Sequence, residues 1–305
     1  MFWNKKPQKR KKSKSPPKVT KSPAPQKKPK PYSPPPLPPK VDMPKPFAEK
    51  QEEPAAPKTL PPSFDGEKEF LRVFKELTYR HRAWDVWRDF IVMSACALSN
   101  PVDKTHFDER EARYLRAIGK YSKPEQRLFP ELFAHTVMAL EQDPEQDFLG
   151  NLYLNLNLCD EGRQQHFTPY SVCRMMADIT VDDIAENVRQ NGYVTINDCC
   201  CGAGATLIAS VHAAKRKLEQ EGLNFQNHIL IAAQDIDEIV ALMCYIQLSL
   251  LGMAAYVKVG NALTDPMTDH DSLENYWFTP MYFSNVWTMR RTIQQAERLL
   301  KGENQ

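Results

Sequence analysis

The chain has 305 residues, 25 of them prolines, and a formal net charge of only +2. Residues 1–60 hold 16 Lys and Arg against 4 Asp and Glu, so the remainder carries an excess of acids. Seven cysteines without regular spacing exclude a disulfide framework and indicate a reducing, cytoplasmic compartment. No apolar run approaches the roughly 18 residues of a membrane span, and the basic N-terminus is not followed by the apolar stretch of a secretory signal.

Residues 1–62 are predicted to be a disordered tail. They hold 18 of the 25 prolines together with many lysines, and such a segment cannot bury enough apolar surface to offset its chain entropy. The run PPPLPPK at 34–40 favours local polyproline structure. We interpret the tail as a solvated linker or a sequence-independent electrostatic arm for nucleic acid. A ligand for a proline-reading domain and a nuclear-import signal are the alternatives.

Residues 64–165 are predicted to form an all-helical domain, because apolar residues recur there with a helical period. Further helices are expected over 106–121 and 124–142. The aromatic residues in the periodic stripes are interpreted as core and not as a binding surface. The two stripes are Phe70, Val73, Phe74 and Leu77, and Trp84, Trp87 and Ile91.

Residues 166–305 are predicted to form an α/β domain. Its first helix is expected to begin with Thr168 as the cap and Pro169 at the first helical position. Strands are then expected at 193–198, 228–237 and 254–263, with helices at 205–222 and 239–253 between them. This alternation favours a parallel sheet with crossover helices. A fourth strand with its exit loop at 276–283 and a last helix at 286–300 complete the pattern. The first helix should carry one apolar face made of Val172, Met175, Met176 and Ile179.

The stretch INDCCCGAGATL at 196–207 places three adjacent cysteines before two glycines. Adjacent residues on an extended chain point in opposite directions, and the C-x-x-C spacing of zinc sites is missing, so no metal site is expected. His212 and His228 are available, but nothing specific pairs either of them with a cysteine nucleophile. The cysteines are therefore interpreted as small apolar fillers beside a tight turn.

The glycine turn itself indicates a small-molecule site. Gly202 and Gly204 let the backbone approach a ligand closely, between a strand and a helix, where open parallel sheets bind ligands. Leu207 occupies the place of the third glycine of a dinucleotide fingerprint. Asp198 and Asp235 end the first and second strands. One carboxylate can hold a cationic amine and the other both ribose hydroxyls, and S-adenosylmethionine has both groups.

Five segments extend this pattern along the chain. They are D-F-L-G-N-L-Y at 147–153, G-R-Q-Q-H-F-T-P at 162–169, D-C-C-C-G-A-G at 198–204, A-Q-D-I-D at 233–237 and V-G-N-A-L at 259–263. In this order they resemble the motifs of the adenine-specific (N-6) DNA methyltransferases, especially the modification subunits of type I restriction systems. The resemblance implies a Rossmann-like, S-adenosylmethionine-dependent methyltransferase sheet, preceded by the helical domain.

The resemblance also implies roles for individual residues. Thr168 and Pro169 would hold the methionine part of the cofactor, Asp235 its ribose, and Asn261 its adenine, while Cys201 stands at the family's own cysteine position. The implied reaction is methyl transfer to the 6-amino group of adenine in DNA, after the base has left the helix. The implied partners are DNA and a specificity or second methyltransferase subunit, as in restriction-modification.

Two departures from the family pattern concern catalysis. The family's loop N-P-P-[FY] corresponds here to F-T-P-M-Y-F, so Thr279, Pro280 and Tyr282 are the candidate catalytic residues of a degenerate loop. A threonine hydroxyl is shorter than an amide, and errors near 1 Å can cost about a hundredfold in rate. Asn261 stands where the family has Asp. The sheet is also expected to be incomplete, without the family's later strands and recognition region.

Three functions therefore stay open. The first is an adenine-specific DNA methyltransferase that uses S-adenosylmethionine. The second is a non-catalytic methyltransferase-fold protein that acts as a DNA-associated or partner-binding module. The third, a methyltransferase of RNA or of protein amides, meets the same difficulty at the catalytic loop, because related enzymes share that loop.

Overall fold

The computed structural model describes residues 64–158, 167–268 and 270–300. The tail predicted for residues 1–62 lies outside the described residues, and so does the 162–166 part of the motif that ends in Pro169. In the described ranges, no helix is both long enough and apolar enough to cross a membrane.

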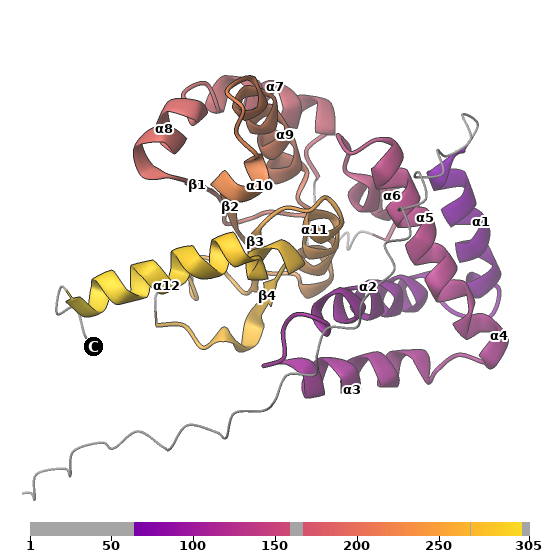
Figure 1. Ribbon diagram of the computed structural model, residues 1–305. Coiled ribbons are helices and arrows are strands. Elements are labelled where there is room, and N and C mark those ends of the chain that lie inside the picture. Colours follow the sequence, from indigo (N-terminus) through magenta and orange to yellow (C-terminus); the bar gives the residue numbers. More distant parts are fainter. Residues whose placement is uncertain (1–63, 159–166, 269, 301–305) are drawn as a thin grey trace, which may run out of the picture. The chain divides into compact units, whose positions relative to one another are not determined.

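The segment 64–158 forms helices, as its apolar period predicts (Figure 1). Side-chain caps define two of the helix starts: the Asp65 carboxylate accepts a hydrogen bond from the Lys68 N–H at 3.0 Å, and Ser122 and Glu125 form a capping box. The helices are α1 (Gly66–Thr78), α2 (Ala83–Ser99), α3 (Phe107–Ile118), α4 (Lys123–Gln126), α5 (Leu128–Gln142) and α6 (Phe148–Asn155).

The aromatic stripes of α1 and α2 are core, with one exception. Phe70 and Trp87 are fully buried and meet edge to face with ring centres 6.1 Å apart. Trp84 is 38 % exposed, so its assignment to the core is wrong. It lies in the first turn of α2, and its ring centre is 6.2 Å from that of the buried Tyr153.

The predicted alternation of strands and helices is confirmed in the second part of the chain, with shorter boundaries and an additional helix, α8, that the sequence pattern does not reveal. The elements are α7 (Tyr170–Thr180), α8 (Ile184–Asn191), β1 (Val194–Asp198), α9 (Ala205–Gln220), α10 (Phe225–His228), β2 (Ile229–Asp235), α11 (Glu238–Leu250), β3 (Ala255–Val259), η2 (Leu273–Asn275), β4 (Tyr276–Phe278), η3 (Pro280–Phe283) and α12 (Asn285–Leu300).

The start of α7 differs from the prediction. Pro169 is extended, with ψ of 135°, and is itself the cap residue, and no side chain caps the helix, so Thr168 does not act as its cap. The predicted apolar face exists but is exposed: Met175 is 61 % and Ile179 73 % accessible. The buried residues of α7 are Cys173 and Ala177, because the helix packs on α9 through these small side chains.

The sheet has the order β1-β2-β3-β4. β1, β2 and β3 are parallel, as predicted, whereas β4 runs antiparallel to β3 with Tyr256 opposite Phe278. The fourth strand is antiparallel because it follows β3 through loop and 3₁₀ structure, whereas a parallel strand needs a longer crossover, usually helical. α9 and α11 pack on one face of the sheet, where Ile196, Ile231 and Val257 point.

The helices of 64–158 and the sheet share one hydrophobic core. α2 packs on α11, and the Arg110 guanidinium donates a hydrogen bond to the Tyr276 carbonyl at 2.6 Å. The boundary predicted between residues 165 and 166 lies outside the described residues, and the helices before it share a core with the elements after it.

Candidate functional site

The carboxyl ends of the three parallel strands meet at one edge of the sheet. Asp198 ends β1, Asp235 ends β2, and Asn261 follows β3. Backbone hydrogen bonds join these ends: the Gly260 N–H donates to the Asp235 carbonyl at 2.9 Å, and the N–H of Cys201 donates to the carbonyl of the residue before Asp235 at 3.0 Å. The structure therefore brings together the strand-end residues that the sequence singled out.

The glycine turn between β1 and α9 needs both of its glycines. Gly202 has φ of +55° and Gly204 has φ of +100°, conformations that L side chains rarely adopt. A Cβ at Gly204 would also lie 2.9 Å from the Cys244 sulfur of α11. The Asp198 carboxylate accepts a hydrogen bond from the Cys200 N–H at 3.1 Å, so the acid also fixes the start of the turn.

Asp235 is locked against the glycine turn. One carboxylate oxygen accepts from the Gly202 N–H at 2.9 Å and the other from the Asp237 N–H at 2.9 Å. Burial raises the pKa of the Asp235 carboxyl above its usual range, and the two backbone hydrogen bonds act against that rise. A carboxylate has about four lone-pair sites, so this one can still accept hydrogen bonds from ribose hydroxyls.

The Phe-Thr-Pro segment ahead of α7 lies beside the same turn. The ring of Phe167 is 3.6 Å from the position that a Cβ would take at Gly202. The Cys173 sulfur lies 3.7 Å from both the Thr168 carbonyl and the hydroxyl of Thr206 in the first turn of α9. Thr168 and Pro169 are exposed at this place.

Asn261 shapes the loop after β3. Its side-chain oxygen accepts from the Leu263 N–H at 2.9 Å, and its carbonyl accepts from the Asp265 N–H at 2.7 Å. The oxygen of the amide is thus used within the loop, and the amide nitrogen is the group that can face a ligand.

The three adjacent cysteines do not share one environment. Cys201 is buried beside Cys244, and the contact between the two thiols, together with burial, raises the pKa of Cys201 well above its usual value. The filler interpretation is confirmed for Cys201 and is wrong for Cys199 and Cys200, which are exposed. Desolvation also raises the pKa of Cys200, the opposite of what a thiolate nucleophile needs. Among the described residues, no group of three His, Cys, Asp or Glu side chains could hold a metal ion.

A buried polar network supports the turn, and the sequence reasoning missed it. The Gln247 amide nitrogen, on α11, donates to the Ala203 carbonyl of the turn and to the Asp147 carboxylate that caps α6, both at 2.8 Å. The amide oxygen of Gln247 accepts from the Leu149 N–H at 3.1 Å. Burial raises the pKa of Asp147. A glutamine in the apolar run of α11 was the available signal, because buried polar groups need partners.

The candidate catalytic loop does not reach this edge of the sheet. Thr279 is fully buried, and its hydroxyl donates to the Met253 carbonyl at 2.7 Å and accepts from the Ala255 N–H at 2.9 Å. Because β4 is antiparallel to β3, Thr279 lies beside the first residue of β3, whereas the glycine turn lies at the other end of the parallel strands. At about 3.3 Å per residue, the five residues of β3 separate the two edges by roughly 13 Å. The catalytic role of Thr279 stays a prediction, and its place in the fold does not support it.

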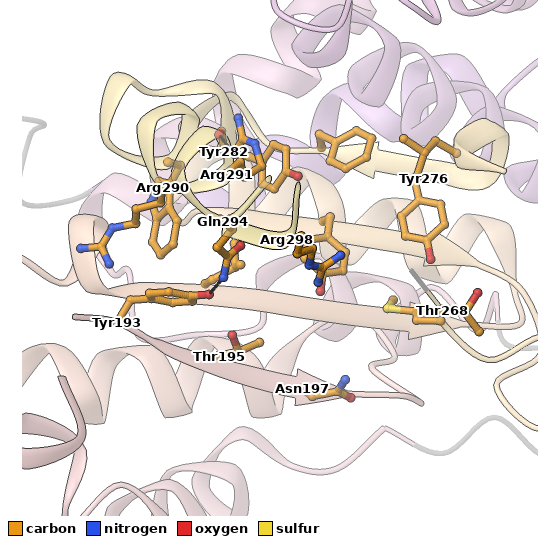
Figure 2. Close-up of a pocket in the computed structure, with 16 residues that line it drawn as sticks. Tyr193, Thr195, Asn197, Thr268, Tyr276, Tyr282, Arg290, Arg291, Gln294 and Arg298 are labelled. Carbon is orange, nitrogen blue, oxygen red and sulfur yellow. Dashed lines mark hydrogen bonds between the residues drawn. The ribbon is translucent and has the colours of Figure 1, made fainter. Parts of the chain in front are cut away.

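Pro280 and Tyr282 follow Thr279 in η3, and they do not reach the turn either. The Tyr282 carbonyl accepts from the Arg291 guanidinium at 2.7 Å, and the same guanidinium stacks 3.9 Å from the centre of the Tyr282 ring. Tyr282 lines a cavity on the sheet face opposite α9 and α11 (Figure 2).

The fold and the turn define a class: an α/β protein whose glycine turn and strand-end acids meet at the carboxyl edge of a parallel sheet. Residues 145–304, more than half of the chain, match the N-6 DNA Methylase family, and the chain belongs to that family. The matched segment includes α6, the glycine turn and α12. No curated protein matches the chain.

Proposed function

We propose that this DNA methylase family member binds S-adenosylmethionine at the glycine turn. The observation that carries the proposal is Asp235, a partly buried carboxylate held by the Gly202 N–H at the carboxyl edge of the sheet. An acid at this place in nucleotide-binding folds accepts ribose hydroxyls. Bound there, S-adenosylmethionine would supply an electrophilic methyl group.

The neighbouring residues suit the rest of that molecule. Asp198, at the end of β1, offers a carboxylate for the cationic amine of the methionine part. The exposed residues Thr168 and Pro169 follow Phe167, whose ring lies beside the turn. Asn261 stands at the end of β3, where its amide nitrogen can donate to a ring nitrogen of adenine.

The reaction that this family membership favours is methyl transfer to the 6-amino group of adenine in DNA. Such a transfer needs acceptors that hold the two hydrogens of the target amine beside the methyl group. Thr279 cannot serve, because its hydroxyl accepts from the Ala255 N–H and donates to the Met253 carbonyl. These hydrogen bonds favour a second candidate: a cofactor-binding member that is not catalytic by itself and works with a specificity or second methyltransferase subunit.

Calorimetric titration of the full chain with S-adenosylmethionine tests cofactor binding. Asp235→Ala should weaken binding by at least about tenfold, since it removes the carboxylate that accepts ribose hydroxyls and the anchor of the Gly202 N–H. Cys200→Ala is the matched control, because it changes an exposed side chain of the same turn. No heat with the unmodified chain, or equal losses in both variants, would refute the proposed site.

A second assay separates the two candidate functions. Transfer of a radiolabelled methyl group into total unmethylated DNA samples every short target sequence in one experiment. If the chain alone incorporates methyl groups, it is a methyltransferase. The groups that accept the hydrogens of the target amine then belong to residues other than Thr279. Cofactor binding without incorporation, with incorporation restored by a partner subunit, establishes the non-catalytic role.

A further inference from the structure

A cavity of about 550 Å³ lies on the sheet face that α9 and α11 leave uncovered (Figure 2). Its floor is made by alternate residues of the strands, among them Thr195 and Asn197 of β1 and Tyr256 of β3. One wall is α12, which contributes Arg290, Arg291 and Arg298 among others. The volume falls within the roughly 300–1,000 Å³ of small-molecule pockets. The glycine turn is not part of this cavity.

The side chains of the cavity floor differ from those of a sheet face that another layer of the protein would bury. Parallel sheets covered on both faces have nearly continuous apolar strands. In β1 the side chains instead alternate, with Val194 and Ile196 toward the helices and Thr195 and Asn197 toward the cavity. Thr195 and Asn197 are exposed. The β1 part of the floor is therefore suited to a polar ligand, whereas Leu230, Tyr256 and Phe278 make the rest of it apolar or aromatic.

The wall made by α12 is cationic. Three arginines and no Asp or Glu are found among the residues that line the cavity. Within the described part of the chain, no carboxylate forms an ion pair with Arg290 or Arg291. The Arg290 guanidinium lies 5.1 Å from the ring centre of Tyr193 and 5.3 Å from that of Trp287. Rings hold this guanidinium in place, so its charge remains available to an anion.

Aromatic rings lie next to these charges. Tyr193 accepts a hydrogen bond from the Gln294 side chain at 2.7 Å, which fixes its ring at the cavity rim. Tyr282 is held under the Arg291 guanidinium. At the opposite end, near Thr268, the acids Asp265 and Asp271 are both engaged by the buried Lys258. An anionic group therefore belongs at the α12 end of the cavity.

We propose that this cavity binds a nucleotide unit, with its phosphate on the arginines of α12 and its base against the tyrosine rings. Proteins that bind single-stranded nucleic acid commonly use a cationic groove with interleaved aromatic rings. Any base can stack on such a ring, so this binding does not depend on sequence. Bases of an intact duplex are paired and stacked within the helix, so the unit comes from a single strand or a free nucleotide. The site is separate from the proposed cofactor turn and does not depend on it.

Fluorescence anisotropy of the full chain with a labelled oligothymidine of about 12 nucleotides tests the proposal, since single-strand sites span about 4–16 nucleotides. Arg290→Gln should weaken binding about fivefold and reduce the salt slope by about 0.7, the value for one lost contact with a single-stranded phosphate. Arg116→Gln makes the same charge change on the exposed surface of α3 and should alter neither quantity. Equal effects of both variants would overturn the site, because they would report net charge alone.

The aromatic part of the proposal has its own variants. Tyr193→Leu should weaken binding at least about fivefold, because stacking on the ring is lost. Tyr193→Phe retains the ring and should bind nearly as the unmodified chain does, and thermal unfolding of all variants shows whether each is folded. Equal weakening by Leu and Phe would refute stacking on Tyr193.

Two further measurements identify the source of the nucleotide and the place of contact. If unlabelled thymidine monophosphate displaces the oligonucleotide at equal concentration, the ligand is a free nucleotide, whereas resistance to displacement assigns a single strand. Photo-crosslinking should attach the oligonucleotide to peptides that contain Tyr193 or Tyr282. Crosslinks confined to residues 1–62, with binding unchanged by Arg290→Gln, would overturn the proposal. Titration of Arg290→Gln with S-adenosylmethionine should match the unmodified chain.

Discussion

Gly204 carries two separate constraints. Its φ of +100° disfavours any L side chain, and a Cβ would lie 2.9 Å from the Cys244 sulfur. Gly204→Ala should therefore lower the free energy of unfolding by about 2–5 kcal/mol, from backbone strain of about 1–2 kcal/mol and overpacking of about 1–3 kcal/mol. Chemical denaturation of the full chain measures this loss.

Gly222 provides the control for that prediction. Its φ is +70°, and nothing lies within 4 Å of a Cβ built there. Gly222→Ala shares the backbone strain and lacks the contact with α11, so it should cost only about 1–2 kcal/mol. Equal losses at the two glycines would show that the sulfur moves away easily and that close packing does not set the shape of the turn.

Thr279 shows that the role of a single residue cannot be assigned from its position in a sequence motif alone. Its place in the chain, after a strand and before Pro280 and Tyr282, is that of a catalytic asparagine. Its hydroxyl nevertheless serves the backbone at Met253 and Ala255. A sequence motif gives the order of residues along the chain, but the direction of the strand that presents them decides which edge of the sheet they reach.

At the scale of elements, the loop between β3 and β4 holds the antiparallel strand in place. The buried Lys258 ammonium donates to Asp265 at 2.8 Å and to Asp271 at 2.6 Å, and the Tyr276 hydroxyl also donates to Asp271 at 2.6 Å. These hydrogen bonds, from Lys258 first and then from Thr268 and Tyr276, hold the pKa of Asp271 well below its usual range. The charged form of Asp271 is thus the one that ties the loop to the sheet.

This lowered pKa predicts how stability depends on pH. Because the folded-state pKa of Asp271 is below the unfolded value of about 4, the unfolded chain binds more protons between those two values. The stabilisation is present above pH 4 and is lost as the pH falls toward the folded-state pKa. Asp271→Asn should therefore flatten the fall in the free energy of unfolding between about pH 5 and pH 2. Asp108→Asn on the surface of α3 is the control, and identical slopes in both variants would contradict the role of Asp271.

The elements themselves were largely predictable because their signals are local. Apolar period, glycines and terminal acids indicated β1, β2 and β3 with α9 and α11 between them, within a few residues of the observed bounds. The same local signals indicated the glycine turn, Asp198 and Asp235. Contacts between distant segments were not predictable. A glutamine in the apolar run of α11 indicates that Gln247 needs buried partners, but it does not indicate that these are Asp147 and Ala203.

The direction of β4 and the exposure of the apolar face of α7 are two features that the sequence pattern does not give, and both are non-local. The alternation of strands and helices stops after β3, and the pairing of β4 depends on the loop around Lys258. The apolar period of α7 gave its face correctly, but period alone does not tell which face meets α9.

At the scale of the whole molecule, charge is divided between two parts of the chain. Residues 1–60 carry an excess of 12 positive charges, and the rest carries an excess of 10 negative charges. A body with excess acid attracts a polyanion only where cations are concentrated, as on α12 at the cavity. Affinity for nucleic acid should therefore have two components, one from the tail through many phosphates and one from the cavity through few.

Deletion of residues 1–62 separates these components. Since log affinity falls with log salt in proportion to the number of phosphates contacted, the deletion should reduce both the affinity for DNA at low salt and the steepness of its salt dependence. The deletion should leave the thermal unfolding of the remaining chain and its titration with S-adenosylmethionine unchanged. In the deleted chain, Arg290→Gln should still weaken oligothymidine binding about fivefold, as in the full chain, because the two sets of contacts are independent. Unchanged DNA retention after the deletion would remove the tail from nucleic-acid binding, and loss of the Arg290→Gln effect would show that the cavity acts only with the tail present.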